Sequence, residues 1–205
     1  MSSYSNFNDM HLDVMREIGN IGAGNACTAL SSLLGRMIDM SVPNVQLIDS
    51  NSAAEYLGGS DNVVLGIKVD VKVDLSGMMF HIVNKKFAEK IINTFYPKEL
   101  ASVADLDEMD ASVLSEMANI TSGAYASALA SLSGFVVDIG TPSQNCSTVT
   151  DILKIPMSEI GSDSDQIIVI DETFIMNEEQ IKSNMLLVLE PDSLVKLFNK
   201  LGVVV

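Results

Sequence analysis

An internal duplication restricts what this chain can fold into more than any other feature of its sequence. When the sequence is shifted by 99 residues against itself, 11 of the 27 positions from 17 to 43 are identical to their counterparts in 116–142. Unrelated segments of this length share one or two residues, at about 5–7% per position from ordinary residue usage. After a length change of five residues, 61–65 also aligns with 165–169. We therefore expect one domain over residues 1–205, made of two equivalent repeats at about 9–100 and 106–205.

Each repeat is predicted to contain a long helix, three strands and a shorter helix. Enrichment in β-branched residues and partial alternation predict strands near 42–49, 62–70 and 73–83, and near 137–149, 166–175 and 181–190. The helices are expected at 9–35 and 107–134, followed by 87–95 and 194–201 in their respective repeats. Gly35 and Gly134 stand where each long helix should end in a left-handed cap.

The duplication also predicts how the repeats associate. A single long helix over a short sheet cannot bury its apolar faces alone, and 47% of the residues are hydrophobic, which is enough to fill a core. The expected fold is therefore α+β, with the strands of both repeats in one shared antiparallel sheet. Helices should flank this sheet, and a pseudo-twofold axis should relate the two repeats.

Charge excludes several classes of partner. The chain has 27 Asp and Glu against 12 Lys and Arg, a formal net charge of −15. Nucleic acids and anionic membranes bind through a surplus of Lys and Arg, so neither is expected as a partner. The uncharged stretch between Glu116 and Asp138 is long enough to cross a bilayer, but its many Asn, Thr, Ser and Gly residues favour a helix buried by protein.

The sequence predicts a cytoplasmic protein without a bound cofactor. Residues 1–8 are polar and lack the basic and apolar regions of a signal peptide. Cys27 and Cys146 stand far apart, and His11 and His81 are isolated, so neither a disulfide framework nor a metal site is indicated.

Three faces are predicted on the first long helix. Residues spaced by four, three and four positions form a narrow polar stripe: Asp13, Glu17, Asn20 and Gly24. About a third of a turn away lies the expected buried face: Val14, Ile18, Ile21 and Ala29. The third face consists of small residues: Gly19, Gly22, Ala23 and Ala26. A glycine inside a helix costs about 1 kcal/mol relative to alanine, so three of them within six residues predict a close approach to the backbone.

The polar stripe recurs on the second long helix, as Ser112, Glu116, Asn119 and Gly123. A Glu/Asn stripe on one helix is ordinarily a solvated face. Here the Glu and the Asn recur in both repeats, although Asn25 has become Ala124 in the second. This selective retention favours a function for the stripe.

A Glu and an Asn one turn apart suggest a limited set of reactions. Neither is a strong nucleophile, and no His or second carboxylate completes a catalytic triad. A carboxylate can pair with a cation, and a side-chain amide can hold a water through its donor and its acceptor. Phosphoryl transfer can use such groups, because much of its catalysis is positioning and charge stabilisation around an in-line nucleophile. The stripe could therefore hydrolyse a phosphate that a partner protein holds together with its metal.

At these residues the sequence resembles the CheC phosphatases of prokaryotic chemotaxis, a family related to CheX and to the flagellar switch phosphatase FliY. The family motif is Asp or Ser, three residues, Glu, two residues, Asn, twenty-two residues and Pro. It occurs here as Asp13, Glu17, Asn20 and Pro43, and again as Ser112, Glu116, Asn119 and Pro142. The resemblance covers essentially the whole chain.

The resemblance implies hydrolysis of the aspartyl phosphate on the response regulator CheY, with Mg²⁺ bound by the regulator. It implies that Glu17 and Glu116 contact the regulator's active-site lysine and that Asn20 and Asn119 orient the attacking water. Asp13 and Ser112 would support the helix surface, and Pro43 and Pro142 would shape the start of the adjoining strand.

The resemblance also implies a second partner, the receptor deamidase CheD, which binds CheC and raises its activity. No motif locates the interface with CheD. The extra residues at 150–164 break the symmetry between the repeats, and a CheD contact is expected there.

Two other interpretations of the sequence compete with this one. The Gly19, Gly22 and Gly24 run is unlike a nucleotide-binding loop, because no strand precedes it and it lies inside a helix. The serious alternative is a non-catalytic module, either an adaptor that binds CheY or CheD or a relative of the flagellar switch proteins. Both Glu/Asn pairs are intact, which favours the enzyme. The replacement of Gly19 by Ala118 is the clearest difference between the two sites.

Overall fold

The strands form one antiparallel sheet to which both halves of the chain contribute. The computed structural model describes residues 8–160, 166–176 and 178–203. Over these residues the sheet has eight strands in the order β1-β7-β8-β4-β3-β5, with β2 also paired to β7 and β6 also paired to β3. The elements are α1 (Asp9–Leu34), β1 (Asp39–Met40), β2 (Asn44–Asp49), α2 (Ser50–Tyr56), β3 (Val63–Val73), β4 (Gly77–Val83), α3 (Lys85–Ile92), the 3₁₀ turn η2 (Val103–Asp105), α4 (Glu108–Ser133), β5 (Val137–Ile139), β6 (Ser143–Thr148), α5 (Val149–Ile160), β7 (Gln166–Met176), β8 (Glu179–Leu189) and α6 (Pro191–Lys200).

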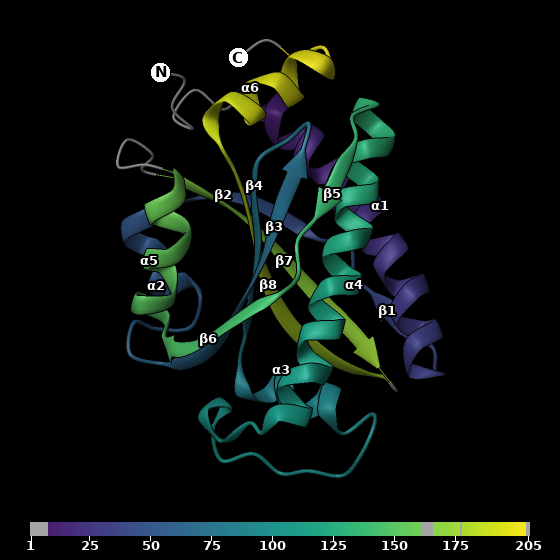
Figure 1. Cartoon of the computed structure of the whole chain (residues 1–205), viewed down its shortest axis with the longest axis vertical. Helices are drawn as coiled ribbons and strands as arrows, with labels where there is room; N and C mark the ends of the chain where they lie inside the picture. Colours follow the sequence, from purple (N-terminus) through teal and green to yellow (C-terminus); the bar gives the residue numbers. More distant parts are fainter. Residues whose placement is uncertain (1–7, 161–165, 177, 204–205) are drawn as a thin grey trace.

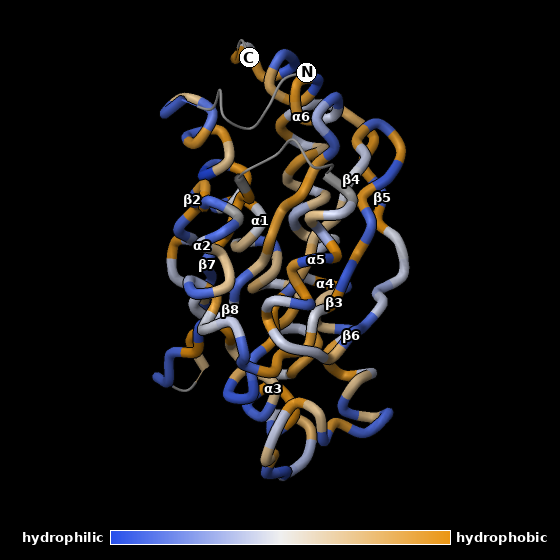
Figure 2. The backbone as a smooth tube through the Cα atoms, turned by 90° about the vertical axis from the view of Figure 1, so that its left-hand side faces the viewer, coloured by the Kyte–Doolittle hydropathy of each residue, from blue (hydrophilic) through white to orange (hydrophobic). Residues whose placement is uncertain are grey.

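Helices lie on both sides of the sheet and at both ends of the molecule. α1 and α4 lie next to each other over one face, and α2 and α5 lie together on the other side of the sheet (Figure 1). α3 and α6 stand at opposite ends of the molecule (Figure 1). Hydrophobic stretches run along the strands through the middle of the molecule, between these helices (Figure 2). The two long helices therefore share one support, the face of the sheet beneath them.

The expected fold class and the shared antiparallel sheet are confirmed. The long helices begin and end within one residue of the predicted bounds. Gly35, with a φ of 61°, and Gly134, with a φ of 71°, end them in the left-handed conformation that glycine adopts at least cost. The order of helices and strands from α1 to α3 is the same as from α4 to α6, which is the order that a duplication predicts.

Several element boundaries differ from the prediction. The strand expected at 42–49 begins only after Pro43, and the one expected at 137–149 is interrupted before Ser143, because proline has no N–H to give to a sheet. The strand expected at 73–83 begins at Gly77, since the preceding residues form the turn from β3. The short helices α2 and α5 were not predicted.

The strand pairings also correct the alignment of the two repeats. Asn44 pairs with Asp171, and Ser143, which lies 99 residues after Asn44, pairs with Lys68. β3 therefore matches β7 at a shift of 171 − 68 = 103 residues, whereas aligning 61–65 with 165–169 gives 104. A shift of one residue exchanges the two faces of a strand, so the sequence alignment was wrong in this strand.

The small-residue face of α1 is buried, and at its centre it meets an aromatic ring of α4. A Cβ atom placed on Gly22 would lie 2.6 Å from Cδ1 of Tyr125. The same construction at Gly24 meets no atom within 4 Å, because Gly24 belongs to the exposed stripe. The predicted close approach is thus confirmed at Gly22. Ala29 is exposed rather than buried, since the last turns of α1 contact the protein through the small-residue face and Leu30.

Substitution of Gly22 should destabilise the protein, and substitution of Gly24 should not. In Gly22→Ala the new methyl group meets the Tyr125 ring, which is fully buried and cannot move aside freely, so we expect a loss of about 1–3 kcal/mol in the free energy of unfolding. Gly24→Ala adds a methyl group in open space and should leave stability unchanged or raise it by up to about 1 kcal/mol. Urea unfolding of both variants measures the difference, and equal stabilities would contradict this packing.

Candidate functional site

The first stripe lies on the exposed side of α1. Asp13, Glu17 and Asn20 are all exposed, as is Gly24. The helix begins at the N-cap residue Asn8, whose side chain accepts hydrogen bonds from two backbone N–H groups of the first turn. Pro43 is buried beneath the same helix, 3.8 Å from the Cβ position of Gly19, on the turn that bears Glu17 and Asn20. Pro43 therefore lies against the buried side of the turn whose exposed side bears Glu17 and Asn20.

The second stripe borders an open hollow. Ser112 and Glu116 are exposed, and Asn119 and Pro142 are partly buried. All four line one hollow of about 500 Å³, whose remaining walls are Ser115, Ile139, Gly140 and Thr141. The helix α4 forms one side of this hollow, and the loop from β5 to β6 forms the other. A partner side chain inserted here would meet the carboxylate and the amide together.

A cluster of charges fixes the start of α4. The N-cap Asp107 accepts hydrogen bonds from the backbone N–H groups of Met109 and Asp110, and Lys98 Nζ donates to its Oδ2 at 2.7 Å. Lys98 also pairs with the buried carboxylate of Asp110, to which the Tyr96 hydroxyl donates at 2.7 Å. The Lys98 hydrogen bond and the backbone N–H of Asp110 hold the pKa of Asp107 at about 2. The first turn of α4 is thus held from outside the helix as well as by its own cap.

Buried polar contacts hold the middle of α4 to the sheet. His81 Nε2 lies 2.8 Å from Ser122 Oγ, and the Tyr125 hydroxyl donates to Glu172 Oε1 at 2.8 Å. Burial lowers the pKa of His81 to about 4, so its imidazole is neutral at physiological pH. Burial raises the pKa of Glu172 to about 7, and its other oxygen has no hydrogen-bond partner among the described residues.

The two sites differ in their local charge. At the first site Arg16 Nη1 lies 2.6 Å from Asp13 Oδ1, and both side chains are largely exposed, so this pair adds little stability. The corresponding residues at the second site are Ser115 and Ser112, which are neutral. Glu17 therefore neighbours an arginine, whereas Glu116 does not.

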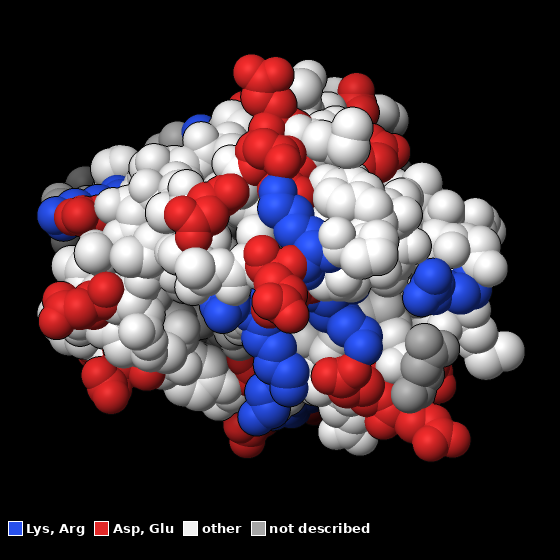
Figure 3. Space-filling view, turned by 90° about the horizontal axis from the view of Figure 1, so that it is seen from below, with Lys and Arg blue, Asp and Glu red and all other residues white. Residues whose placement is uncertain are grey.

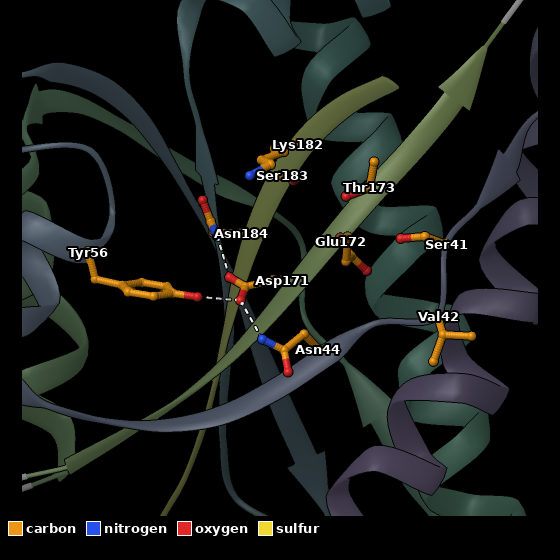
Figure 4. Close-up of a pocket in the computed structure, with 10 residues that line it drawn as sticks. All are labelled: Ser41, Val42, Asn44, Tyr56, Asp171, Glu172, Thr173, Lys182, Ser183 and Asn184. Atoms are coloured by element: carbon orange, nitrogen blue, oxygen red, sulfur yellow. Dashed lines mark hydrogen bonds between the residues drawn. The ribbon is translucent and has the colours of Figure 1, made fainter. Parts of the chain in front are cut away.

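A second hollow lies on the other side of the sheet, near the loop that precedes β2. It measures about 470 Å³, and Tyr56, Asp171, Asn44 and Asn184 line it (Figure 4). Asp171 accepts hydrogen bonds from the Tyr56 hydroxyl and from the Asn184 amide, the latter at 2.7 Å. Gln46 Nε2 donates to the same carboxylate at 2.7 Å. This carboxylate joins α2 to three strands, which is a structural role.

Neither a metal centre nor a membrane helix is found in the described part of the chain. Across residues 8–160, 166–176 and 178–203, no three His, Cys, Asp or Glu side chains come close enough to hold a metal ion. Over the same residues no helix combines the length and the apolar character needed to cross a bilayer. On the face seen from below, Lys and Arg side chains are interleaved with Asp and Glu rather than gathered into a basic surface (Figure 3).

Both stripes lie in segments that match a single known protein family. The family model described as CheC-like matches residues 10–47 and 109–145, which contain both stripes and the prolines that follow them. The CheY-P phosphatase CheC of Bacillus subtilis (strain 168) is 31% identical over 206 residues, which cover 98% of this chain and 99% of that protein. The flagellar motor switch phosphatase FliY of the same organism is 26% identical over 144 residues, 70% of this chain and 37% of that protein.

A solved structure gives the same assignment of the fold. FliY of Thermotoga maritima superposes with a TM-score of 0.76 over 96% of this chain and 98% of that one, at 21% sequence identity. At this level of identity the similarity establishes the fold alone.

Stability should depend on pH through Glu172. Because the pKa of this buried carboxyl rises from 4.5 to about 7 on folding, its contribution is complete below pH 4.5 and is lost as the pH rises through 7. At about 1.4 kcal/mol per pKa unit the loss is on the order of 3 kcal/mol. Glu172→Gln should therefore lose less free energy of unfolding than the unsubstituted chain between pH 4.5 and 8, as measured by urea unfolding. Parallel pH profiles of the two proteins would contradict this assignment.

Proposed function

Because this chain belongs to the CheC-like family, we propose that it hydrolyses the aspartyl phosphate of the response regulator CheY. The relative with 31% identity over almost the whole chain is named a CheY-P phosphatase. The observation that carries the proposal is the pair of Glu/Asn stripes, in which Glu17, Asn20 and Glu116 are exposed and Asn119 is partly buried. Glu116, Asn119 and Pro142 line one hollow, which has the form expected for a site that receives part of another protein.

In the proposed mechanism this chain supplies geometry and the regulator supplies the phosphate, the lysine and Mg²⁺. Asn20 or Asn119 accepts a hydrogen bond from a water and holds its oxygen in line with the bond from phosphorus to the aspartyl oxygen. The water attacks phosphorus, the aspartyl carboxylate leaves, and inorganic phosphate is released. Glu17 or Glu116 pairs with the regulator's lysine and so fixes the register of the two proteins. An amide needs no shifted pKa for this role, since its contribution is orientation.

The supporting residues have a simpler proposed role. Asp13 and Ser112 lie one turn before the glutamates and shape the surface that the regulator meets. Pro43 and Pro142 end the loops that lie beside the stripes, and so set the position of the strand that begins after each.

Modulation by CheD is part of the proposal on the strength of the family resemblance. Of the expected contact at 150–164, residues 150–160 belong to α5, and 161–164 lie outside the described residues. Thr150, Asp151 and Lys154 are exposed on this helix, which stands on the side of the sheet away from α1 and α4, the helices that bear the stripes (Figure 1). A protein bound at α5 would therefore leave both stripes accessible to CheY.

Removal of both amides tests the proposed reaction. The double variant Asn20→Ala with Asn119→Ala should no longer accelerate phosphate loss from phosphorylated CheY in the presence of Mg²⁺, because no side chain is left to orient the water. Binding to CheY should persist, since both glutamates remain. Asn25→Ala is the matched control: Asn25 is exposed on the same helix but off the stripe, and its counterpart is already Ala124.

The outcomes separate the enzyme from the alternative. Phosphate release from labelled CheY gives the rate, and a pull-down or titration gives binding. A double variant as fast as the unsubstituted chain would refute the water-orienting role. An unsubstituted chain that binds phosphorylated CheY without hydrolysing it would instead favour the non-catalytic adaptor.

A further inference from the structure

We propose that Gln144 is a positioning residue for the second site. It holds the strand that follows Pro142 against the turns of α4 that bear Ser112 and Glu116, and so fixes the width of the hollow between them. The inference rests on the proposed function of that site. Gln144 touches neither water nor phosphate in this role, and it acts through the backbone that presents the Glu/Asn pair.

The contacts of Gln144 span the two walls of the hollow. Its Nε2 donates hydrogen bonds to the backbone oxygen of Ala111 and to Ser115 Oγ, both at 2.6 Å. An amide nitrogen has two hydrogens, so it can satisfy both acceptors at once. Ala111 and Ser115 lie one turn apart on α4, and Gln144 lies two residues after Pro142 on β6. A single side chain thus fastens two successive positions of the helix to the strand next to the motif proline.

Within the part of the chain that the structure describes, the first site has no equivalent of this contact. The residue 99 positions before Gln144 is Val45, which has no polar side-chain atom, and Arg16 stands in the place of Ser115. Arg16 pairs with Asp13 on its own helix instead. Val45 approaches α1 through a methyl group, 3.2 Å from the Cβ position of Gly19. Apolar packing on a glycine therefore holds the first site, and hydrogen bonds hold the second.

This difference explains why the second site has an alanine where the first has Gly19. A methyl group at position 19 would press on Val45, since 3.2 Å is closer than ordinary van der Waals contact. At the second site position 118 has that methyl group and is fully buried, while position 144 is an unbranched glutamine whose amide is directed to Ala111 and Ser115. The methyl group that would press on Val45 at position 19 is thus buried without Val45 at position 118. Ala118 is therefore compatible with an intact second site.

Site-resolved kinetics test the role of Gln144. In an Asn20→Ala background only the second site should act, and there Gln144→Met, which keeps the length of the side chain but not the amide, should lower kcat for phosphorylated CheY roughly tenfold with KM unchanged. In an Asn119→Ala background only the first site should act, and the same substitution should leave kcat and KM as they were. Ser115→Ala in the Asn20→Ala background removes one of the two acceptors and should lower kcat in the same direction by a smaller factor.

The possible results distinguish a positioning role of Gln144 from a general loss of folding and from a failure of the proposed function. A fall in kcat confined to the Asn20→Ala background supports the proposal, because a general loss of folding would reduce both backgrounds alike. An unchanged kcat there, or an equal fall in both backgrounds, overturns it. If the unsubstituted chain fails to dephosphorylate CheY, the proposed function is overturned and this inference with it. If Gln144→Met lowers the midpoint of urea unfolding too far for kinetics, Ser115→Ala decides alone by the same criteria.

Discussion

The exchange of strands between the two halves of the chain is the constraint on which both sites depend. β1 and β2, from the first half, pair with β7 of the second, and β5 and β6, from the second half, pair with β3 of the first. β4 then joins β8 at the centre. Among the described residues, only the β3–β4 and β7–β8 pairings lie within one half, so neither half could complete its sheet alone. Since α1 precedes β2 and α4 precedes β6, this exchange places both long helices over the same face, beside each other.

Between the two halves, residue identity in α1 and α4 changes most at buried positions, whereas the Glu and the Asn of the stripe are the same in both. Beneath α1 and α4 the paired positions hold Ala23 and Ser122, and Ala26 and Tyr125. The size difference in the second pair lets the Tyr125 ring fill the space that Gly22 leaves on the neighbouring helix. Buried layers ordinarily resist change more than surfaces do, because a change in volume is felt at once. A Glu and an Asn kept on the surface while the core was repacked are hard to attribute to folding.

Features with local causes could be predicted from the sequence, and features with distant causes could not. The bounds of α1 and α4 follow from helical spacing and from Gly35 and Gly134, and the placement of the Glu and the Asn on one face of each helix follows from that spacing alone. The helix α5 was missed because it is held by tertiary contacts, with Val149 and Ile152 fully buried against the sheet.

The register of β3 and the role of Gln144 could not be predicted from the sequence, because both depend on contacts with residues far away in the chain. A shift of one residue in a strand alignment changes few identities, yet it exchanges the two faces, and only the pairing partner reveals it. Gln144 could have been noticed as the counterpart of Val45, since a glutamine in place of a buried valine needs hydrogen-bond partners. Which partners it finds is a property of the folded chain.

The rigidity of α4 is understandable from the chemistry proposed for its stripe. A nucleophile or a general base owes its effect to electronic tuning, and burial or a neighbouring charge can supply that tuning. An amide that orients a water contributes only position, so an error of an ångström in its placement removes most of its value. The four contacts that fasten α4, through Asp107, Ser115, Ser122 and Tyr125, are spread along the helix on both sides of Glu116 and Asn119. A helix held both before and after its functional residues provides the fixed position that this kind of site requires.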